Sequence, residues 1–343
     1  MSGDACLVTG AGGFIGYQLA NALASEGRRV VGVDLRYPDP QAVLGAPRFS
    51  PLVADFRNTD AMKHALDGVT VVFHLASAHL RVSLPESEYW DVNVHSLPML
   101  LKLAFDAGVS RFVHTSSVAM YGDLGSTPAN EQTPPHPQSI YGETKLAGEQ
   151  AVLDFCRRKQ LDVVVLRPSW VYGPGCARTA KIIRALRARR FFLVGSGDNL
   201  RHPLYIDDMI DAFRRAAATN DGVGEILLVA GERAVTTREL IESFCAVFEL
   251  PRPVVRLPYS AARALAHCAE AISSFMDREP PVSRRTLEFF DTSNSFDTSR
   301  ARMALGFVPQ YSLLAGLTAT RRWIETRTAL NPQTAATCRR GPA

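Results

Sequence analysis

Short apolar segments rich in valine, leucine and isoleucine alternate with longer helix-like stretches through the first half of the chain. Such β-branched runs, bounded by glycine or polar residues, predict buried strands. Strands alternating with helices predict a doubly wound α/β fold, a parallel sheet covered on both faces that binds ligands at the carboxyl ends of its strands. The predicted strands are residues 5–9, 30–34, 52–55, 71–76, 111–116 and 161–168, and the clearest helices are 14–26 and 141–158.

Beyond residue 168 the pattern is less regular and predicts a smaller, mostly helical region. A loop rich in glycine and proline is expected at 169–175, and an apolar run at 226–230 predicts a last strand. The tail from 331 to 343 is polar and rich in small residues, and we expect it to be flexible. The expected helices are 179–190, 204–218, 236–249, 259–275 and 313–326.

The composition is that of an ordinary globular protein, with 46% hydrophobic and 21% charged residues. The net charge of +4 is spread along the chain, except for a basic run between Arg178 and Arg190. That run is interpreted as a solvated helix face, and the alternative is a rim that attracts an anionic substrate. No recognised module accompanies these basic residues, so nucleic-acid binding is not expected.

The cysteines and the apolar segments indicate a cytoplasmic protein. The six cysteines are scattered and form no CxxC pair, which favours reduced thiols. No charged and apolar leader opens the sequence, and no apolar run reaches the roughly 18 residues of a membrane span. Residues 257–275 are interpreted as an amphipathic helix over a pocket, with peripheral membrane contact as the alternative. We therefore expect no stable membrane insertion, and the sequence leaves open whether the chain forms a homodimer.

A glycine-rich turn between the first strand and the first helix predicts a phosphate cradle. Gly10 allows the tight turn, Gly13 lets a pyrophosphate approach bare backbone, and Gly16 lets the helix pack close to the strand. The helix then begins with Phe14 and Ile15, and its N-terminal N–H groups face the phosphates. The strand before, the helix after and an acid at the end of the next strand together indicate the Rossmann form of a dinucleotide site.

Two acids at strand ends are candidate cofactor ligands. Asp34 closes the second strand, where a carboxylate accepts hydrogen bonds from the adenosine ribose and repels a 2′-phosphate. This favours NAD over NADP, although Arg36 nearby could bind such a phosphate. Asp55 ends the third strand and is expected to reach the adenine edge. Ordinary turn or cap residues are the alternative interpretation of both acids.

A tyrosine and a lysine four residues apart are the candidate catalytic pair. Tyr141 and Lys145 share one face of a predicted helix. The pKa of a free phenol is about 10, and a nearby ammonium is expected to lower it. The phenol can then take a proton from an alcohol, or return one to a ketone, as hydride moves. Ser117, at the end of the strand 111–116, is expected to hold the reacting oxygen near Tyr141.

Four motifs follow one another along the chain, and between them they contain the glycine turn, the strand-end hydroxyl groups and the tyrosine–lysine pair. They are Gly10-x-x-Gly13-x-x-Gly16, Thr115-Ser116-Ser117-x-x-x-Tyr121-Gly122, Tyr141-x-x-x-Lys145 and Leu166-Arg167-Pro168-x-x-Val171-Tyr172-Gly173-Pro174. Together they resemble the extended short-chain dehydrogenase/reductases, which include the NAD-dependent epimerase/dehydratase and 3β-hydroxysteroid dehydrogenase families. The resemblance continues through residues 205–208 and 296–307 and covers most of the chain.

The resemblance implies a role for each matched position. Ser117, Tyr141 and Lys145 are implied to be catalytic, with Tyr141 and Lys145 also touching the cofactor. The division that follows is a NAD-binding Rossmann domain at 1–170, with the sheet re-entered by 204–231, and a substrate-binding region at 171–203 and 232–330. No metal site is expected. The other implied cofactor contacts are Asn93 on a helix under the cofactor, Ala76 at a strand end on the adenosine side, and Pro168 beside the nicotinamide.

Departures from the family motifs bear on the reaction and the substrate. Val118 and Ala119 stand where sugar dehydratases carry an acid and a base, so elimination is not expected. Arg201, seven residues before Asp208, matches a phosphate-binding arginine of sugar-nucleotide epimerases. Trp170 stands where those enzymes often have asparagine, and it predicts a more apolar pocket.

Three functions therefore remain from the sequence. The first is a sugar-directed epimerase or dehydrogenase acting at a secondary alcohol or ketone, most simply on a nucleotide sugar. The second is a 3β-hydroxysteroid dehydrogenase-like oxidoreductase for a hydrophobic alcohol. The third is a non-catalytic dinucleotide sensor, which the intact catalytic residues disfavour.

Overall fold

Seven parallel strands form the central sheet of the computed structural model, which describes residues 5–37, 48–79, 84–159, 161–253, 255–276 and 284–330. Their order is β11-β6-β5-β4-β1-β2-β3, so the direction of winding reverses between β1 and β4. A doubly wound sheet places its ligand at such a switch point. The strands are β1 (Ala5–Thr9), β2 (Arg29–Asp34), β3 (Phe49–Val53), β4 (Val69–His74), β5 (Arg111–Thr115), β6 (Val163–Pro168) and β11 (Ile226–Val229).

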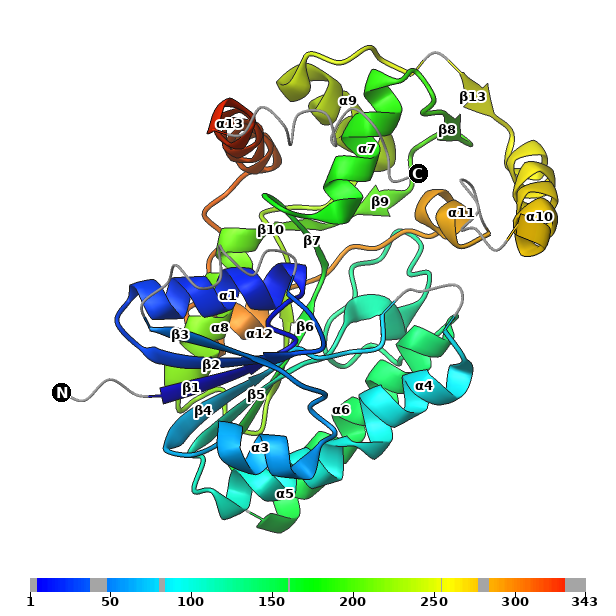
Figure 1. Ribbon diagram of the computed structural model, residues 1–343. Helices are drawn as coiled ribbons and strands as arrows, with labels where there is room; N and C mark the ends of the chain where they lie inside the picture. Colours follow the sequence, from blue (N-terminus) through cyan, green and yellow to red (C-terminus); the bar gives the residue numbers. More distant parts are fainter. Residues whose placement is uncertain are drawn as a thin grey trace.

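Helices cover both faces of this sheet, as the alternating pattern predicts (Figure 1). One face carries α1 (Phe14–Ser25), α8 (Ile206–Ala218) and α12 (Ser299–Leu305), which contribute to one apolar core. The other face carries α3 (Thr59–Ala65), α5 (Leu97–Asp106) and α6 (Ile140–Lys159), which enclose a second core. The Rossmann-like doubly wound fold is therefore confirmed.

A smaller lobe, here called the upper lobe, lies above the carboxyl ends of the strands (Figure 1). Its helices are α7 (Ala177–Arg187), α9 (Thr237–Phe248), α10 (Tyr259–Met276), α11 (Arg284–Asp291) and α13 (Leu313–Leu330). Short strands pair within it and where it joins the sheet domain. The pairs are β7 (Trp170–Tyr172) with β10 (Pro203–Tyr205), β9 (Leu200–Arg201) with β12 (Val235–Thr236), and β8 (Leu193–Val194) with β13 (Arg256–Leu257).

Several predicted boundaries are wrong, and strand pairing explains most of them. The expected loop at 169–175 contains β7, and the expected helix at 204–218 begins at Ile206 because residues 203–205 pair with β7. β3 runs from 49 to 53 rather than 52 to 55, because it pairs with β2 in a register that joins Phe49 to Val30. β4 ends at His74 rather than at 76. Strands of two or three residues leave too little period to recognise in a sequence.

The basic run from 178 to 190 begins on the solvated face of α7 and continues beyond its end with Arg189 and Arg190, and its exposure agrees with both interpretations given above. Ile182, Ile183 and Leu186 are buried, whereas Lys181 and the arginines of this helix are exposed. No helix in the described ranges is long and apolar enough to cross a membrane. The predicted flexible tail at 331–343 lies outside the described residues.

Candidate active site

The turn between β1 and α1 has the form of a phosphate cradle. Gly10 has a positive φ of 72°, and a Cβ there would lie 2.7 Å from the backbone nitrogen of Ala76. A Cβ at Gly16 would lie 2.1 Å from the carbonyl oxygen of Gly10. Only glycine fits these positions, so the turn packs against the end of β4 and leaves bare backbone at the N-terminus of α1. The residues present thus fit the pyrophosphate of a dinucleotide.

Asp34 lies at the rim of this cradle. Its Oδ2 accepts a hydrogen bond of 2.9 Å from the backbone N–H of Gly12, and its Oδ1 accepts one of 3.3 Å from that of Arg36. The two bonds fix the carboxylate beside the glycine turn. A fixed negative charge at this point fits the ribose hydroxyls of NAD and opposes a 2′-phosphate.

Asp55 is engaged within the protein. The Arg57 guanidinium donates to both of its carboxylate oxygens, with Nη2 2.7 Å from Oδ2, and also pairs with Glu88 at 3.0 Å. These hydrogen bonds lower the pKa of Asp55. The adenine contact assigned to Asp55 from the sequence stays a prediction, because this carboxylate already has a guanidinium partner.

Asn93 ties the end of β4 to α6. It lies in a π-helical turn, η1 (Asp91–His95), and is buried. Its Oδ1 accepts hydrogen bonds of 2.9 Å from Ser77 Oγ and from the backbone N–H of Ala78. Its Nδ2 donates to Thr144 Oγ1 at 3.0 Å. Asn93 therefore positions the loop after β4 against the helix that carries Tyr141, a link that its place in the sequence did not reveal.

The three predicted catalytic residues come together at the carboxyl end of β5. The Tyr141 phenol lies near the hydroxyls of Ser117 and Ser77, both of which act to lower its pKa. Lys145, one turn further along α6, donates from Nζ to the carbonyl oxygen of Thr115 at 2.5 Å. Ser117 Oγ also accepts a 3.1 Å hydrogen bond from the backbone N–H of Ala119. Ser77 was missed by sequence reasoning, and its place three residues after the end of β4 was the only signal.

The pKa values of Tyr141 and Lys145 differ in part from the expectation. Burial lowers the pKa of Lys145 to about 8, while the negative charge of Glu149 acts in the opposite direction. Burial raises the pKa of Tyr141, and this effect outweighs the hydrogen bond from Ser117 and the positive charge of Arg178. The expected lowering of the phenol pKa by Lys145 is thus not seen in the protein alone, because desolvation of the phenolate is the larger effect.

A buried ion pair holds α6 against β6. Arg167 Nε lies 2.9 Å from Glu149 Oε2, and Arg167 also donates to the hydroxyl of Tyr121. The Tyr121 hydroxyl in turn donates to the carbonyl oxygen of Asn130 at 2.9 Å. Because Glu149 lies one turn after Lys145, this network fixes the helix that carries the catalytic pair and gives Arg167 of the Leu-Arg-Pro motif a positioning role.

Arg201 is buried in the upper lobe rather than pointing to bulk solvent. Its Nε donates to the carbonyl oxygen of Phe289 at 3.0 Å, and its Nη1 lies 3.2 Å from Thr292 Oγ1. Burial lowers the pKa of Arg201 to about 10, and the positive charge of Arg178 adds to this. Arg178 thus acts electrostatically on both Tyr141 and Arg201, although the sequence showed it only as part of a basic run.

Trp170 also packs against the end of α11, where Phe289 lies. Its ring stacks on Tyr172 with centroids 5.9 Å apart and meets the Phe289 ring edge-on at 6.1 Å. The Trp170 Nε1 donor is buried and has no hydrogen-bond acceptor among the described residues. A buried donor of this kind is costly to leave unmatched, and a ligand oxygen can satisfy it. Trp170 and Arg201 are therefore brought together at the end of α11.

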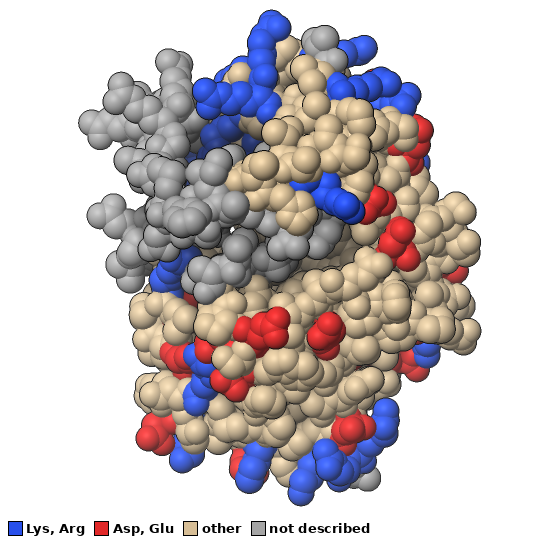
Figure 2. Space-filling model, turned by 90° about the vertical axis from the view of Figure 1, so that its right-hand side faces the viewer, with Lys and Arg blue, Asp and Glu red and all other residues tan. Residues whose placement is uncertain are grey.

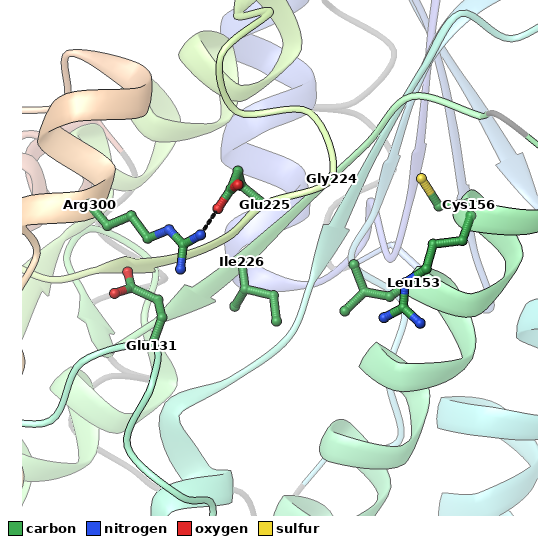
Figure 3. A pocket seen from close by; sticks show the side chains of 8 residues that line it. Glu131, Leu153, Cys156, Gly224, Glu225, Ile226 and Arg300 are labelled. Carbon is green, nitrogen blue, oxygen red and sulfur yellow. Dashed lines mark ion pairs between the residues drawn. The ribbon is translucent and has the colours of Figure 1, made fainter.

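The structure places no free carboxylate at the positions of Val118 and Ala119, which lie in the short helix η2 (Val118–Tyr121). Asp123 Oδ1 accepts a 2.7 Å hydrogen bond from the backbone N–H of Ser293. Glu131 Oε1 accepts one of 2.8 Å from the backbone N–H of Leu228 on the edge strand β11. Figure 3 shows Glu131 in a separate pocket beside the ion pair of Arg300 with Glu225. Both carboxylates are thus engaged with backbone N–H groups.

A glycine cradle, a fixed ribose-side carboxylate and a Ser–Tyr–Lys group at the edge of a doubly wound sheet define a dinucleotide-dependent oxidoreductase site. The comparisons with known proteins agree. A model of the NAD dependent epimerase/dehydratase family matches residues 6–230. The chain therefore belongs to this family and is an enzyme of the extended short-chain dehydrogenase/reductase type, with NAD as its cofactor.

Individual relatives include both sugar and steroid enzymes. A UDP-glucose 4-epimerase of Mycolicibacterium smegmatis is 30% identical, over 92% of this chain and 96% of that protein. A 3beta-hydroxysteroid-dehydrogenase/decarboxylase, isoform 1, of Arabidopsis thaliana is 26% identical, over 92% of this chain and 78% of that protein. The crystal structure of a UDP-glucuronic acid 4-epimerase from Bacillus cereus in complex with NAD superposes with a TM-score of 0.76 and 26% identity, covering 94% of this chain and 99% of that one.

Proposed function

We propose that the enzyme epimerises or oxidises a secondary alcohol of a nucleotide-linked sugar. The observation that carries this proposal is the proximity of the Ser117 hydroxyl to the Tyr141 phenol, one helical turn from Lys145, at the edge that also carries the glycine cradle. The sugar nucleotide is supported by relatives with UDP-sugar activities and by Arg178, whose positive charge acts on both Tyr141 and the buried Arg201.

The chain's own groups supply the proton chemistry. Bound NAD supplies the hydride acceptor. Burial favours the neutral phenol of Tyr141 in the protein alone, and the positive nicotinamide ring of bound NAD would favour the phenolate. As the phenolate, Tyr141 takes the proton from the substrate hydroxyl, and Ser117 donates a hydrogen bond that fixes the reacting oxygen. The Lys145 ammonium, held by the Thr115 carbonyl oxygen, keeps positive charge near the phenolate. Epimerisation would return hydride to the opposite face of the transient ketone, whereas net oxidation would release the ketone.

In this proposal the sheet domain, 1–170 with 204–231, holds NAD. Residues 171–203 and 232–330 hold the substrate, with Trp170 and Arg201 on their side of the cleft. The five described cysteines are all free, which supports a reducing, cytoplasmic setting.

A second candidate function is oxidation of a hydrophobic alcohol. The observation in its favour is the aromatic surface made by Trp170, Tyr172 and Phe289 at the end of α11. A steroid-type relative of similar identity supports the same candidate. Such a surface accepts apolar rings more readily than a phosphorylated sugar.

One substrate panel separates these candidates. Purified enzyme is incubated with NAD and either UDP-sugars or sterol-like alcohols, while the absorbance of reduced cofactor and the products are followed. An epimeric sugar without net reduced NAD identifies an epimerase, and accumulation of reduced NAD identifies a dehydrogenase. Turnover of sterols alone would replace the first proposal by the second, and turnover of neither class would reject both. Tyr141→Phe is the control for catalysis at this site.

A further inference from the structure

Two segments of the upper lobe carry basic residues and no acidic ones. Residues 177–197 and 250–269 contain nine lysines and arginines and no aspartate or glutamate, whereas the whole chain has a net charge of only +4. Eight of the nine have exposed side chains and no ion pair in the part of the chain that the structure describes. These eight are Lys181, Arg184, Arg187, Arg189, Arg190, Arg252, Arg256 and Arg263.

Of the acids that border these segments, Asp198 and Glu249 are neutralised by other arginines, and Glu270 directly follows the second segment. Asp198 pairs with Arg238 at 3.1 Å, and Glu249 pairs with Arg321 at 2.8 Å. Neither carboxylate is therefore left to offset the eight exposed cations. The contrast within the upper lobe indicates that the basic surface is not an ordinary mixed, ion-paired surface.

Pairing of β8 with β13 joins the two segments into one surface. Leu193 pairs with Arg256, and the Leu193 N–H donates to the Val255 carbonyl oxygen at 3.2 Å. This brings the arginines before β8 next to those that flank β13. Figure 2 shows lysine and arginine gathered over the top of the upper lobe, while most of the acidic side chains lie lower on that face. We call the exposed residues of α7, β8, β13 and α10 the basic face.

Apolar side chains are exposed on the same face. Val255 is 55% exposed and Leu265 is 52% exposed. Helix α10 buries Ala262 and Ala266 against Val194 and Leu287, yet its outer side is also largely apolar. The exposed residues of this helix include the apolar Ala261, Ala264 and Leu265, together with Cys268 and the polar Ser260, Arg263 and His267. A water-facing helix surface normally carries polar and charged residues of both signs.

We propose that the basic face docks this enzyme on bilayers that contain anionic lipid. The arginines would bind the negatively charged headgroup layer, and Leu265 and Val255 would enter its apolar border. The exposed apolar groups favour a lipid surface over nucleic acid, since a phosphate backbone offers them no partner. Docking is peripheral, in agreement with the absence of a membrane-crossing helix among the described residues. The proposal does not depend on the substrate.

The test is cosedimentation of the full-length protein with vesicles. One set is phosphatidylcholine alone, and the other contains about 30% phosphatidylglycerol. We expect binding only to the anionic set, with strong loss at high salt, because screening shortens the range of the attraction from about 10 Å to about 3 Å between 0.1 M and 1 M salt. Duplex DNA is titrated in parallel as the competing polyanion.

Matched variants then locate the surface. Arg190→Glu with Arg256→Glu is expected to weaken vesicle binding by at least about tenfold, since each basic residue near an anionic bilayer contributes about a fivefold effect. Lys159→Glu with Arg302→Glu makes the same charge change on exposed, unpaired residues outside the basic face and should leave binding intact. Leu265→Ser should weaken binding with little change in its salt dependence. Thermal unfolding and NAD affinity report on folding in each variant.

Three results would overturn the proposal. The first is equal binding, or none, with the two kinds of vesicle. The second is an equal loss of binding in the two double variants, which would show a response to net charge alone. The third is tighter binding to duplex DNA than to anionic vesicles, which would make the basic face a nucleic-acid surface.

Discussion

The Arg201 guanidinium lies over the ring of Phe289, with Cζ 4.7 Å from the ring centroid, while Nε donates to the carbonyl oxygen of the same residue. One arginine on β9 thus holds the end of α11 by two kinds of contact. A change at Arg201 should therefore remove the positive charge that we propose for substrate binding and also shift the aromatic surface beside Trp170.

Replacing Arg201 separates these two roles. We expect Arg201→Ala to raise KM by about tenfold or more, because it removes a buried cation and loosens α11. Arg201→Lys keeps a positive charge but loses the forked guanidinium that reaches both Phe289 and Thr292. Its KM for a phosphorylated substrate should therefore lie between those of wild type and Arg201→Ala. Steady-state kinetics and thermal unfolding are measured together. An unchanged KM in a folded Arg201→Ala enzyme would remove Arg201 from substrate binding.

Tyr141→Phe should keep the fold and NAD affinity while turnover falls by about 10²–10⁴-fold, the usual contribution of a positioned acid–base group. The phenol has no substitute, since Ser117 and Ser77 are too weakly acidic to replace it. Tyr17→Phe on α1 is the matched control, because its hydroxyl has no hydrogen bond among the described residues. Near-native turnover in Tyr141→Phe would show that another group moves the proton.

Because of Lys145, the free energy of unfolding should change with pH in the alkaline range. Its pKa is lowered from 10.5 to about 8 by burial, so between these values the unfolded chain holds more protons than the folded one. Stability therefore rises with pH across this window, as the cost of a buried ammonium disappears. That cost is about 3 kcal/mol below pH 8, at about 1.4 kcal/mol for each pH unit.

The measurement compares wild type with Lys145→Met by denaturant unfolding at pH 7 and pH 10. Groups other than Lys145 titrate in both proteins, so their contributions cancel in the difference. Relative to wild type, Lys145→Met should be most stable at pH 7, and its stability relative to wild type should fall toward pH 10. A difference that does not change with pH would mean that Lys145 titrates alike in folded and unfolded protein.

Cofactor choice should depend on the charge of Asp34. Asp34→Asn keeps an oxygen to accept the Gly12 N–H but removes the negative charge, so the preference for NAD over NADP should narrow by about tenfold. Asp60→Asn, at an exposed carboxylate on α3, should leave the ratio of affinities unchanged. Fluorescence titration with both reduced cofactors gives the two dissociation constants. A clear NADP preference in the wild type would point to Arg36 instead.

Sugar 4,6-dehydration should be absent. Val118 and Ala119 cannot move protons, and the nearby acids Asp123 and Glu131 accept hydrogen bonds from the backbone N–H groups of Ser293 and Leu228. Each missing proton transfer is worth about 10²–10⁴-fold. Incubation with dTDP-glucose and GDP-mannose, followed by mass spectrometry for loss of water, checks this. Efficient formation of a 4-keto-6-deoxy product would show that an acid and a base reach the site from elsewhere.

Some features of this protein follow from the sequence because they are local. The cradle depends on the backbone of a few adjacent residues, where Gly10 and Gly16 admit no side chain. The spacing of Tyr141 and Lys145 sets both on one helix face whatever surrounds them. The alternation of apolar runs likewise predicts the parallel sheet, since each strand must bury both faces.

Other features depend on contacts between segments that are distant in the sequence. The Asn93–Thr144 hydrogen bond spans 51 residues, and the hold of Arg201 on Phe289 spans 88. The burial that raises the pKa of Tyr141, against the expectation, comes from the elements packed around it. The pattern of hydrophobic and polar residues does not predict such contacts, because they depend on which surfaces pack together in the folded chain. The sequence therefore predicted the cofactor site and the catalytic group, whereas the tertiary structure decided the protonation of Tyr141 and Lys145, their supporting residues and the packing of Arg201 and Trp170 at the end of α11.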